Sequence, residues 1–204
     1  FWVLGGGTDS VYKYNASGVY QGVSFSVASQ DTSPSGIAWD GTYFWVIGTA
    51  TDSVYKYNDS GVYQNVSFSV ASEDTAPFDI AWDGTYFWVT GGARVYKYNS
   101  SGVYENVYFT AVSGPSSIRG IAFDGTYLWL VGLADDRAYK YSVSGTYQGI
   151  SFDVSQDSRN SGITWDGTNL WVVGYTGDKA YKYIPAVGIE SDTSFGGQNY
   201  VRVK

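Results

Sequence analysis

The stretch Trp39-Asp40-Gly41-Thr42-Tyr43-Phe44-Trp45-Val46 decides the fold of this chain, because it returns at a regular spacing along the sequence. It recurs almost unchanged at 82–89, in altered form at 123–130 and 165–172, and truncated at 1–3. The Trp of its Phe-Trp-Val triplet, in which Leu replaces Phe in two copies, lies at Trp2, Trp45, Trp88, Trp129 and Trp171. The steps between these positions are 43, 43, 41 and 42 residues.

A repeat of this length is typical of one blade of a β-propeller. Within the second copy, short segments rich in Val, Tyr, Trp and Ser alternate with turn signals, and no segment shows the 3.6-residue period of a helix. The segments that we expect to be strands are 36–39, 43–47, 54–57 and 62–70. Asp40-Gly41 separates the first two, because Gly accepts a positive φ. The sequence therefore predicts an all-β, five-bladed β-propeller of four-stranded antiparallel blades.

The ends of the chain must complete the ring. The first copy lacks its innermost strand, and the fifth copy loses the repeat after Tyr183. We predict that 186–190 forms the outer strand of the last blade and that the alternating segment 199–203 pairs with the N-terminal blade, which would remove the open sheet edges. The alternative is that residues preceding Phe1 in a longer or processed chain supply the missing strand. The expected blades of this single domain (1–204) are 1–30, 35–73, 78–114, 118–156 and 160–192, with a closing strand at 198–204.

The composition narrows the classes of function. The 204 residues include no Cys, Met or His, so disulfides, thiolate metal sites and histidine catalysis are excluded. Aromatic residues make up 19% of the chain, which is enough apolar surface for a packed core, and most of the eight Trp are expected to fill the wedges between blades. A net charge of −7 argues against nucleic acid as a partner. No apolar run approaches the roughly 18 residues of a membrane span, so we expect no membrane insertion.

The differences between near-identical copies show where recognition would lie. The segments 8–46 and 51–89 differ at six of 39 positions, and four of the six fall within 30–36. These four pairs are Gln30/Glu73, Ser33/Ala76, Ser35/Phe78 and Gly36/Asp79. They lie in the loop between blades, on a face that propellers often use for binding. Surface drift and diversification of a binding face both explain this pattern.

Charge on the same face identifies further candidates. The loops carry mainly acids, including Asp52 and Asp74, whereas Arg94 and Arg119 suggest a basic sector around the third blade. Our candidate ligand-binding residues are Asp52, Asp74, Phe78, Asp79, Arg94 and Arg119.

Catalytic and metal sites have weaker support. A glycoside hydrolase needs two or three convergent carboxylates, yet the positions that begin the inner strands read Gly36, Asp79, Arg119 and Gly162, of which one is acidic. Loop carboxylates such as Asp52 and Asp74 have the chemistry for Ca²⁺ or Mg²⁺ but match no known loop spacing. The recurrent Asp-Gly acids read as turn residues. We predict no catalytic residue, no metal site and no cofactor.

The tripeptide Tyr-Lys-Tyr occurs in all five copies, for example at 55–57. One interpretation is a Lys stem lying along an aromatic wall with cation–π attraction, and the other is five equivalent ligand sites.

The repeat resembles the blades of highly repetitive β-propellers, and the blade count resembles the tachylectin-2-like lectins. The likeness is architectural and covers about residues 1–183. The motif Trp-Asp-Gly-Thr-Tyr-Phe-Trp-Val is not that family's sugar-site motif, so no lectin site is carried over. The repeats and the tail Gly-Gly-Gln-Asn-Tyr-Val-Arg-Val-Lys also look like propellers of phage virions or tail fibres. The resemblance implies a rigid disc that binds a partner, often a glycan.

We therefore expect a non-enzymatic binding module, at an extracellular or virion surface, that recognises a glycan or a protein surface as a monomer or as part of a larger assembly. The alternatives are a structural or scaffold component of a virion or tail fibre without a small ligand, and a carbohydrate-active enzyme.

Overall fold

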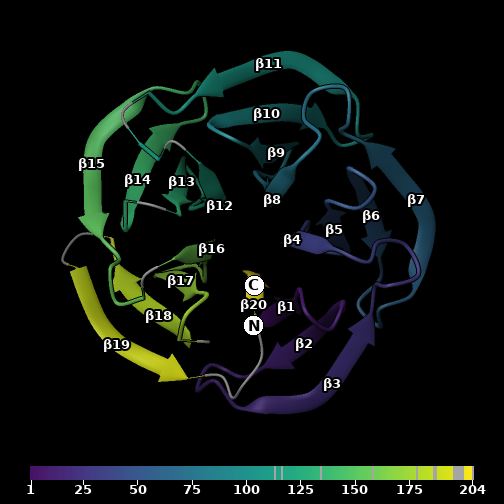
Figure 1. The fold of residues 1–204 in the computed structure, drawn as a ribbon, viewed down its shortest axis with the longest axis horizontal. Coiled ribbons are helices and arrows are strands. Elements are labelled where there is room, and N and C mark those ends of the chain that lie inside the picture. The colour runs from purple at the N-terminus through teal and green to yellow at the C-terminus, as the bar shows by residue number, and fades with distance from the viewer. Residues whose placement is uncertain are drawn as a thin grey trace.

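The chain forms a five-bladed β-propeller (Figure 1). The computed structural model describes residues 1–112, 114–115, 117–133, 135–157, 159–177, 179–185, 188–194 and 200–203, the last two ranges by their backbone. Among these residues there is no helix, so none could span a membrane. The all-β, five-bladed prediction is confirmed.

Each blade is a four-stranded antiparallel sheet, described here from its innermost strand outward. The first blade contains β20 (Tyr200–Val203), β1 (Trp2–Gly5), β2 (Ser10–Tyr14) and β3 (Tyr20–Ser26). The second contains β4 (Pro34–Trp39), β5 (Phe44–Gly48), β6 (Ser53–Tyr57) and β7 (Tyr63–Ser69). The third contains β8 (Pro77–Trp82), β9 (Tyr86–Gly91), β10 (Arg94–Asn99) and β11 (Tyr104–Thr110). The fourth contains β12 (Ile118–Phe123), β13 (Tyr127–Gly132), β14 (Arg137–Ser142) and β15 (Tyr147–Asp153). The fifth contains β16 (Asn160–Trp165), β17 (Leu170–Gly174), β18 (Lys179–Ile184) and β19 (Gly188–Ser194).

The C-terminal tail supplies the innermost strand of the first blade. Strand β20 pairs antiparallel with β1, with Val203 opposite Trp2 and Tyr200 opposite Gly5. Both ends of the chain thus meet in one sheet near the centre of the ring (Figure 1), as the alternation of 199–203 predicts. Asn199 lies outside the described residues, as do Ala186 and Val187, which the sequence assigned to the outer strand of the last blade.

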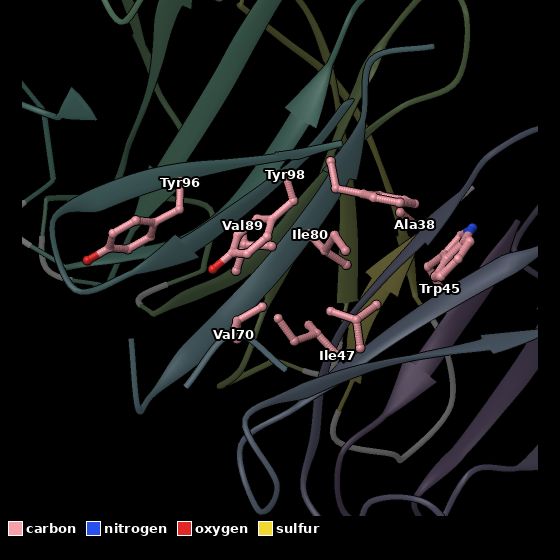
Figure 2. Packing of buried hydrophobic residues seen from close by; sticks show 10 residues of the cluster. Ala38, Trp45, Ile47, Val70, Ile80, Val89, Tyr96 and Tyr98 are labelled. Atoms are coloured by element: carbon pink, nitrogen blue, oxygen red, sulfur yellow. The ribbon is translucent and has the colours of Figure 1, made fainter. Parts of the chain in front are cut away.

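The second strand of every blade forms the core of the ring. All five residues of β5 are buried, which explains why the sequence shows no alternation there: neighbouring blades cover both faces of the strand. Figure 2 shows the packing between the second and third blades, where Trp45 and Ile47 approach Ile80 and Val89. The Trp45 ring lies 4.8 Å from the ring of Phe87 in the next blade. An equivalent contact joins the fifth blade to the first, because the ring centres of Trp171 and Phe1 lie 4.9 Å apart.

The Asp-Gly turns hold these Trp side chains in place. Asp40 accepts backbone hydrogen bonds from Thr42 (2.8 Å) and Tyr43 (2.7 Å) through one oxygen. Its other oxygen accepts the indole N–H of Trp45 at 2.7 Å. The equivalent indole bond is also 2.7 Å long in the third, fourth and fifth blades. The recurrent acids are therefore structural, as predicted, and they tie each turn to the wedge-filling Trp.

In Asp166, burial and hydrogen bonding have opposite effects on the pKa of the carboxyl group. Burial by itself would raise the pKa of Asp166, but the hydrogen bonds from the Trp171 indole and from Asn169 and Thr168 outweigh it and lower the pKa. The folded state thus favours the charged carboxylate that these donors require.

The outer strands curve around the perimeter through a bulge. The register of β6 against β7 shifts between Tyr55 and Tyr57, and Asn65 in the bulged strand has a φ of 56°. Gly22 occupies the equivalent place in the first blade with a φ of 69°. Both residue types tolerate this conformation, which explains the Gly22/Asn65 difference between copies. The apolar face of the outer strand in the second blade is only partly buried. Val70 is inaccessible, whereas Val66 remains 43% exposed.

Candidate functional site

The inner strands begin around a pocket at one end of the propeller axis. The pocket has a volume of about 390 Å³ and is lined by Gly6, Ser33, Pro34, Ser35, Thr49, Phe78, Arg119, Leu133, Arg159, Ser161 and Tyr175. These residues come from all five blades, so the pocket exists only when the ring closes. We call it the central pocket.

A β-bulge on each of the four inner strands β4, β8, β12 and β16 presents a side chain to this pocket. In β4 the register jumps from Pro34 to Gly36, so Ser35 has no partner on β5. The equivalent bulge residues are Phe78, Arg119 and Ser161. All four line the central pocket. Bulges often re-aim side chains next to functional sites, and here they place a variable residue of the repeat at the axis.

Arg119 and Phe78 form one wall of the pocket. The guanidinium carbon of Arg119 lies 3.8 Å from the centre of the Phe78 ring, which is a close cation–π contact. The Nε atom of Arg119 is buried and has no hydrogen-bond partner. A buried donor without an acceptor is unfavourable, so a ligand or an ordered water that accepts this hydrogen bond would be stabilised there.

Arg159 and Tyr175 form a second wall. The guanidinium carbon of Arg159 lies 5.3 Å from the Tyr175 ring centre, and the backbone N–H of Tyr175 donates to the carbonyl of Arg159 at 3.0 Å. Arg159 has a φ of 131°, a conformation that side chains other than Gly rarely adopt. Strained backbone of this kind is concentrated at functional sites.

The central pocket is positively charged within an acidic protein of net charge −7. It contains Arg119 and Arg159, and none of the described residues that line it is acidic. Burial and, to a smaller degree, the charge of Arg159 lower the pKa of the Arg119 guanidinium. The charge of Arg159 therefore disfavours the charged form of Arg119, and an anion bound between them would offset this effect.

Hydroxyl groups of the second blade line another side of the central pocket. The Ser35 hydroxyl donates to the carbonyl of Pro77 at 3.0 Å, and the Thr49 hydroxyl donates to the carbonyl of Ser33 at 3.2 Å. Each hydroxyl that donates once keeps lone pairs that can accept. This side of the pocket suits a ligand that carries hydroxyl donors.

Two of the six candidate residues, Phe78 and Arg119, lie in the central pocket and contact each other. The sequence alignment of the inner strands was wrong by one residue, however. Counted back from Trp39, Trp82 and Phe123, which end the inner strands, Arg119 is equivalent to Ser35 and Phe78, and the residue equivalent to Asp79 is Gly120.

Asp79 lies beneath the pocket and is 1% exposed. One of its oxygens accepts the backbone N–H of Ile80, and the other accepts that of Ile121 on the next blade, both at 2.9 Å. Its Cα lies so close to Gly36 that a Cβ built there would meet it at 2.6 Å. Asp79 is therefore a buried link between two inner strands, which argues against its role as an accessible acid or base.

We expect Asp79→Ala to lower the free energy of unfolding by about 1–2 kcal/mol, because the backbone N–H of Ile121 loses its acceptor. Urea unfolding followed by circular dichroism measures this change. As a control, Asp59→Ala changes an exposed carboxylate to the residue found at the same place in the first copy, Ala16. Equal stability of the Asp79 variant and the wild type would contradict the structural role.

The remaining candidates do not reach the central pocket. Asp52 adopts a φ of 49° in the turn before β6, and its carbonyl accepts the N–H of Val70 at 2.8 Å. Asp74 accepts the backbone N–H of Ala76 at 2.8 Å. Arg94 is exposed at the start of β10, with its guanidinium 5.2 Å from the ring of Tyr108. These residues serve turns and the perimeter.

The predicted basic sector of the third blade is also not formed. Arg94 is the first residue of its strand, where the fourth and fifth blades have Arg137 and Lys179, so a cation at this place is common in the ring. Arg119 belongs to the fourth blade and lies at the axis. Within the described residues, no group of three or more acids is arranged to hold a metal ion.

The Lys of Tyr-Lys-Tyr makes the cation–π contacts that the first interpretation predicts. Lys56 lies 3.8 Å from the ring centre of Tyr43, and Lys97 lies 3.6 Å from that of Tyr86. In the fifth blade Asn169 takes the place of this Tyr.

A second pocket of about 460 Å³ opens at the other end of the inner strands, where Trp39, Trp82 and Trp165 are half-buried in its lining.

Sequence reasoning missed Arg159 and Tyr175. Tyr175 follows the Gly that ends β17, and its equivalents Gly6, Thr49 and Leu133 follow the Gly that ends the same strand in other blades; all line the pocket. This variable position after a repeated Gly is a signal that the sequence contains. Arg159 gives a weaker signal, since its equivalent Ser33 differs between the nearly identical copies.

The fold and the central pocket define the class of this protein as a five-bladed β-propeller with a cationic, aromatic pocket on its axis. No protein-family model and no curated protein sequence matches the chain.

Three solved structures share the fold. A catalytically inactive virginiamycin B lyase from Staphylococcus aureus with quinupristin has a TM-score of 0.57 at 17% identity over 94% of this chain. A streptogramin B lyase has a TM-score of 0.58 at 16% identity over 95% of this chain. This chain spans 64% of each of those two lyase chains. A chain of a nidogen/laminin complex has a TM-score of 0.64 at 10% identity over 98% of this chain and 95% of its own length. At these identities the likeness is one of fold.

Proposed function

We propose that this propeller is a non-enzymatic binding module, displayed at an extracellular or virion surface, whose central pocket recognises a glycan. The observation that carries the proposal is the pocket itself. It combines aromatic rings, cations and hydroxyl groups from five blades at the place where near-identical repeats differ. Small-molecule sites in proteins have this character: concave, partly aromatic and provided with a few fixed polar groups.

The fixed position of Asp79 favours binding over catalysis. A glycoside hydrolase needs an acid and a second carboxylate about 5–10 Å apart, and no described residue lining the central pocket is acidic. The lyase chains that share the fold are enzymes by name, yet this chain spans only 64% of them.

Replacing Phe78 tests the proposal. Phe78→Ser introduces the residue found at the equivalent bulges of the second and fifth blades, Ser35 and Ser161, so the substitution is compatible with the fold. We expect wild-type protein to bind glycans on an array and the variant to lose about tenfold or more in affinity, because an aromatic wall contributes roughly 1–2 kcal/mol.

The matched control is Tyr108→Ser. Tyr108 is 53% exposed on the outer strand of the third blade, where other blades carry Ser24, Ser67 and Ser151. We expect this variant to bind as the wild type does. A folded wild-type sample that binds no glycan, or Phe78→Ser with unchanged binding, would refute the proposed function.

A scaffold role in a virion or tail fibre is the second candidate. The perimeter supports it, because each of the first three blades exposes a pair of valines on or beside its outer strand. These pairs are Val19 and Val23, Val62 and Val66, and Val103 and Val107. A scaffold would show no glycan binding and a self-association or partner complex that substitution of these valines abolishes.

A further inference from the structure

We propose that the glycan bound in the central pocket is an acidic sugar, with its carboxylate or sulfate group held between Arg119 and Arg159. This inference rests on the proposed function and names the class of ligand that the same site selects. Three features of the pocket carry it: its two arginines with no acidic residue among the described lining, the donors of Arg119, and the hydroxyl groups and aromatic rings of the same lining.

The charge of the pocket calls for an anion. Arg119 and Arg159 line the same pocket, burial and the charge of Arg159 lower the pKa of Arg119, and none of the described residues in the lining supplies a negative charge. Like charges that share a partly desolvated site are unfavourable, and an opposite charge within about 4–6 Å reverses the effect. Although the protein as a whole has a charge of −7, the two arginines make the local charge of the pocket positive.

The geometry of the donors suits an oxyanion. A guanidinium presents its N–H groups in a planar fork that matches the oxygens of a carboxylate or a sulfate. The guanidinium carbon of Arg119 lies 3.8 Å from the centre of the Phe78 ring, and this contact limits the side-chain freedom that would be lost on binding. Its buried Nε has no acceptor in the protein, and an oxyanion would supply one.

The hydroxyl groups and aromatic rings of the pocket explain why the anion would be carried on a sugar. Ser35, Thr49 and Ser161 line the same pocket as Arg119 and Arg159. The Ser35 and Thr49 hydroxyls already donate to backbone carbonyls, which leaves them as acceptors for the hydroxyl groups of a ligand. The rings of Phe78 and Tyr175 offer apolar surface for the C–H face of a pyranose. A simple anion would use only half of this arrangement.

Binding of matched sugars tests the inference. We would titrate intact protein with sodium glucuronate, glucose 6-sulfate, glucose and sodium sulfate in a calorimeter at low ionic strength. Glucuronate or glucose 6-sulfate is expected to bind about tenfold or more tightly than glucose, because a charge-assisted hydrogen bond contributes about 1.5–3 kcal/mol. Comparison of the two acidic sugars distinguishes carboxylate from sulfate as the preferred group.

The repeats supply substitutions that the fold tolerates. Arg119→Ser matches Ser35 and Ser161, and Arg159→Ser matches Ser33. Each is expected to weaken binding of the acidic sugar about tenfold and to reduce the preference for the acidic sugar over glucose. Arg94→Ser and Arg137→Ser are the controls, because they remove exposed arginines outside the pocket at positions where Ser10 and Ser53 occur. These controls are expected to bind as the wild type does.

The outcomes separate this inference from the proposed function. Glycan binding that does not distinguish acidic from neutral sugars, or that survives both arginine substitutions, overturns the acidic-sugar inference and leaves the binding module standing. Sulfate alone binding as tightly as glucose 6-sulfate also overturns it, because the sugar would then contribute nothing. Failure of every sugar, neutral or acidic, to bind on the array and in the calorimeter refutes the proposed function together with the inference.

Discussion

Replacing Asp83 with alanine is expected to lower the free energy of unfolding by about 2–4 kcal/mol, because one carboxylate satisfies three donors. One oxygen of Asp83 accepts the backbone N–H groups of Thr85 (2.8 Å) and Tyr86 (2.7 Å). The other accepts the indole N–H of Trp88, which is 1% exposed. Alanine would leave that indole donor buried without a partner, and it would also loosen the turn that begins β9.

Urea unfolding followed by far-ultraviolet circular dichroism measures this effect without relying on the Trp signal. Asp59→Ala again serves as the control, since it removes an exposed turn carboxylate and reproduces Ala16 of the first copy. It is expected to change stability by less than about 0.5 kcal/mol. A loss for Asp83→Ala no greater than that of the control would show that the Asp–Trp bond is dispensable.

Gly174→Ala is expected to destabilise the protein by about 3 kcal/mol, at the upper end of the usual range for overpacking. A Cβ at this position would meet the Cγ of Asp157 at 2.0 Å and its Cβ at 2.1 Å. Asp157 is 5% exposed and cannot move freely, because its carboxylate accepts the backbone N–H groups of Thr176 (3.1 Å) and Gly177 (2.6 Å). The substitution would therefore separate two loops that border the central pocket.

The matched control for this prediction is Gly6→Ala. A Cβ at Gly6 would meet nothing closer than the carbonyl oxygen of Pro34 at 3.6 Å, which is an ordinary contact. The difference in midpoint between the two variants in urea, at equal slope, gives the effect of the close approach alone. If Gly174→Ala had the same urea midpoint as Gly6→Ala, the packing of Asp157 against β17 would be less tight than the structure indicates.

The same packing corrects our view of the acidic loops. The sequence places Asp31, Asp74 and Asp157 on a face that we expected to be an acidic rim. In the structure Asp31 and Asp157 are buried, and Asp31 accepts the backbone N–H and the hydroxyl of Thr51. These two buried carboxylates link one loop to the next and are not accessible to a ligand, whereas Arg119 and Arg159 line the central pocket.

The arrangement of the blades could be read from the sequence because it depends on local rules repeated five times. The spacing of the Trp fixed the number of blades, and Asp-Gly turns marked the hairpins. Near-identity of the second and third copies then isolated Ser35/Phe78 and Gly36/Asp79 as differences. These same positions begin the inner strands, which is why Phe78 and Arg119 were recognised as candidates.

What the sequence did not contain was the bulge. The unpaired residue of these inner strands is Ser35, Phe78, Arg119 or Ser161, and all four line the pocket, which a strictly alternating strand does not predict. Nor could the sequence show that Asp79 is buried between two strands whereas Arg119 reaches the pocket.

The sequence by itself thus determined that this chain is a ring of five sheets held by Trp wedges and Asp-capped turns, because those contacts lie within one repeat or between adjacent repeats. Only the tertiary structure decided that Phe78, Arg119, Arg159 and Tyr175 share one pocket. These residues come from three blades and are separated by up to 97 positions. Closure of the ring brings them to the axis, where the described lining of the pocket holds two arginines and no acidic residue, and the proposed ligand depends on this charge.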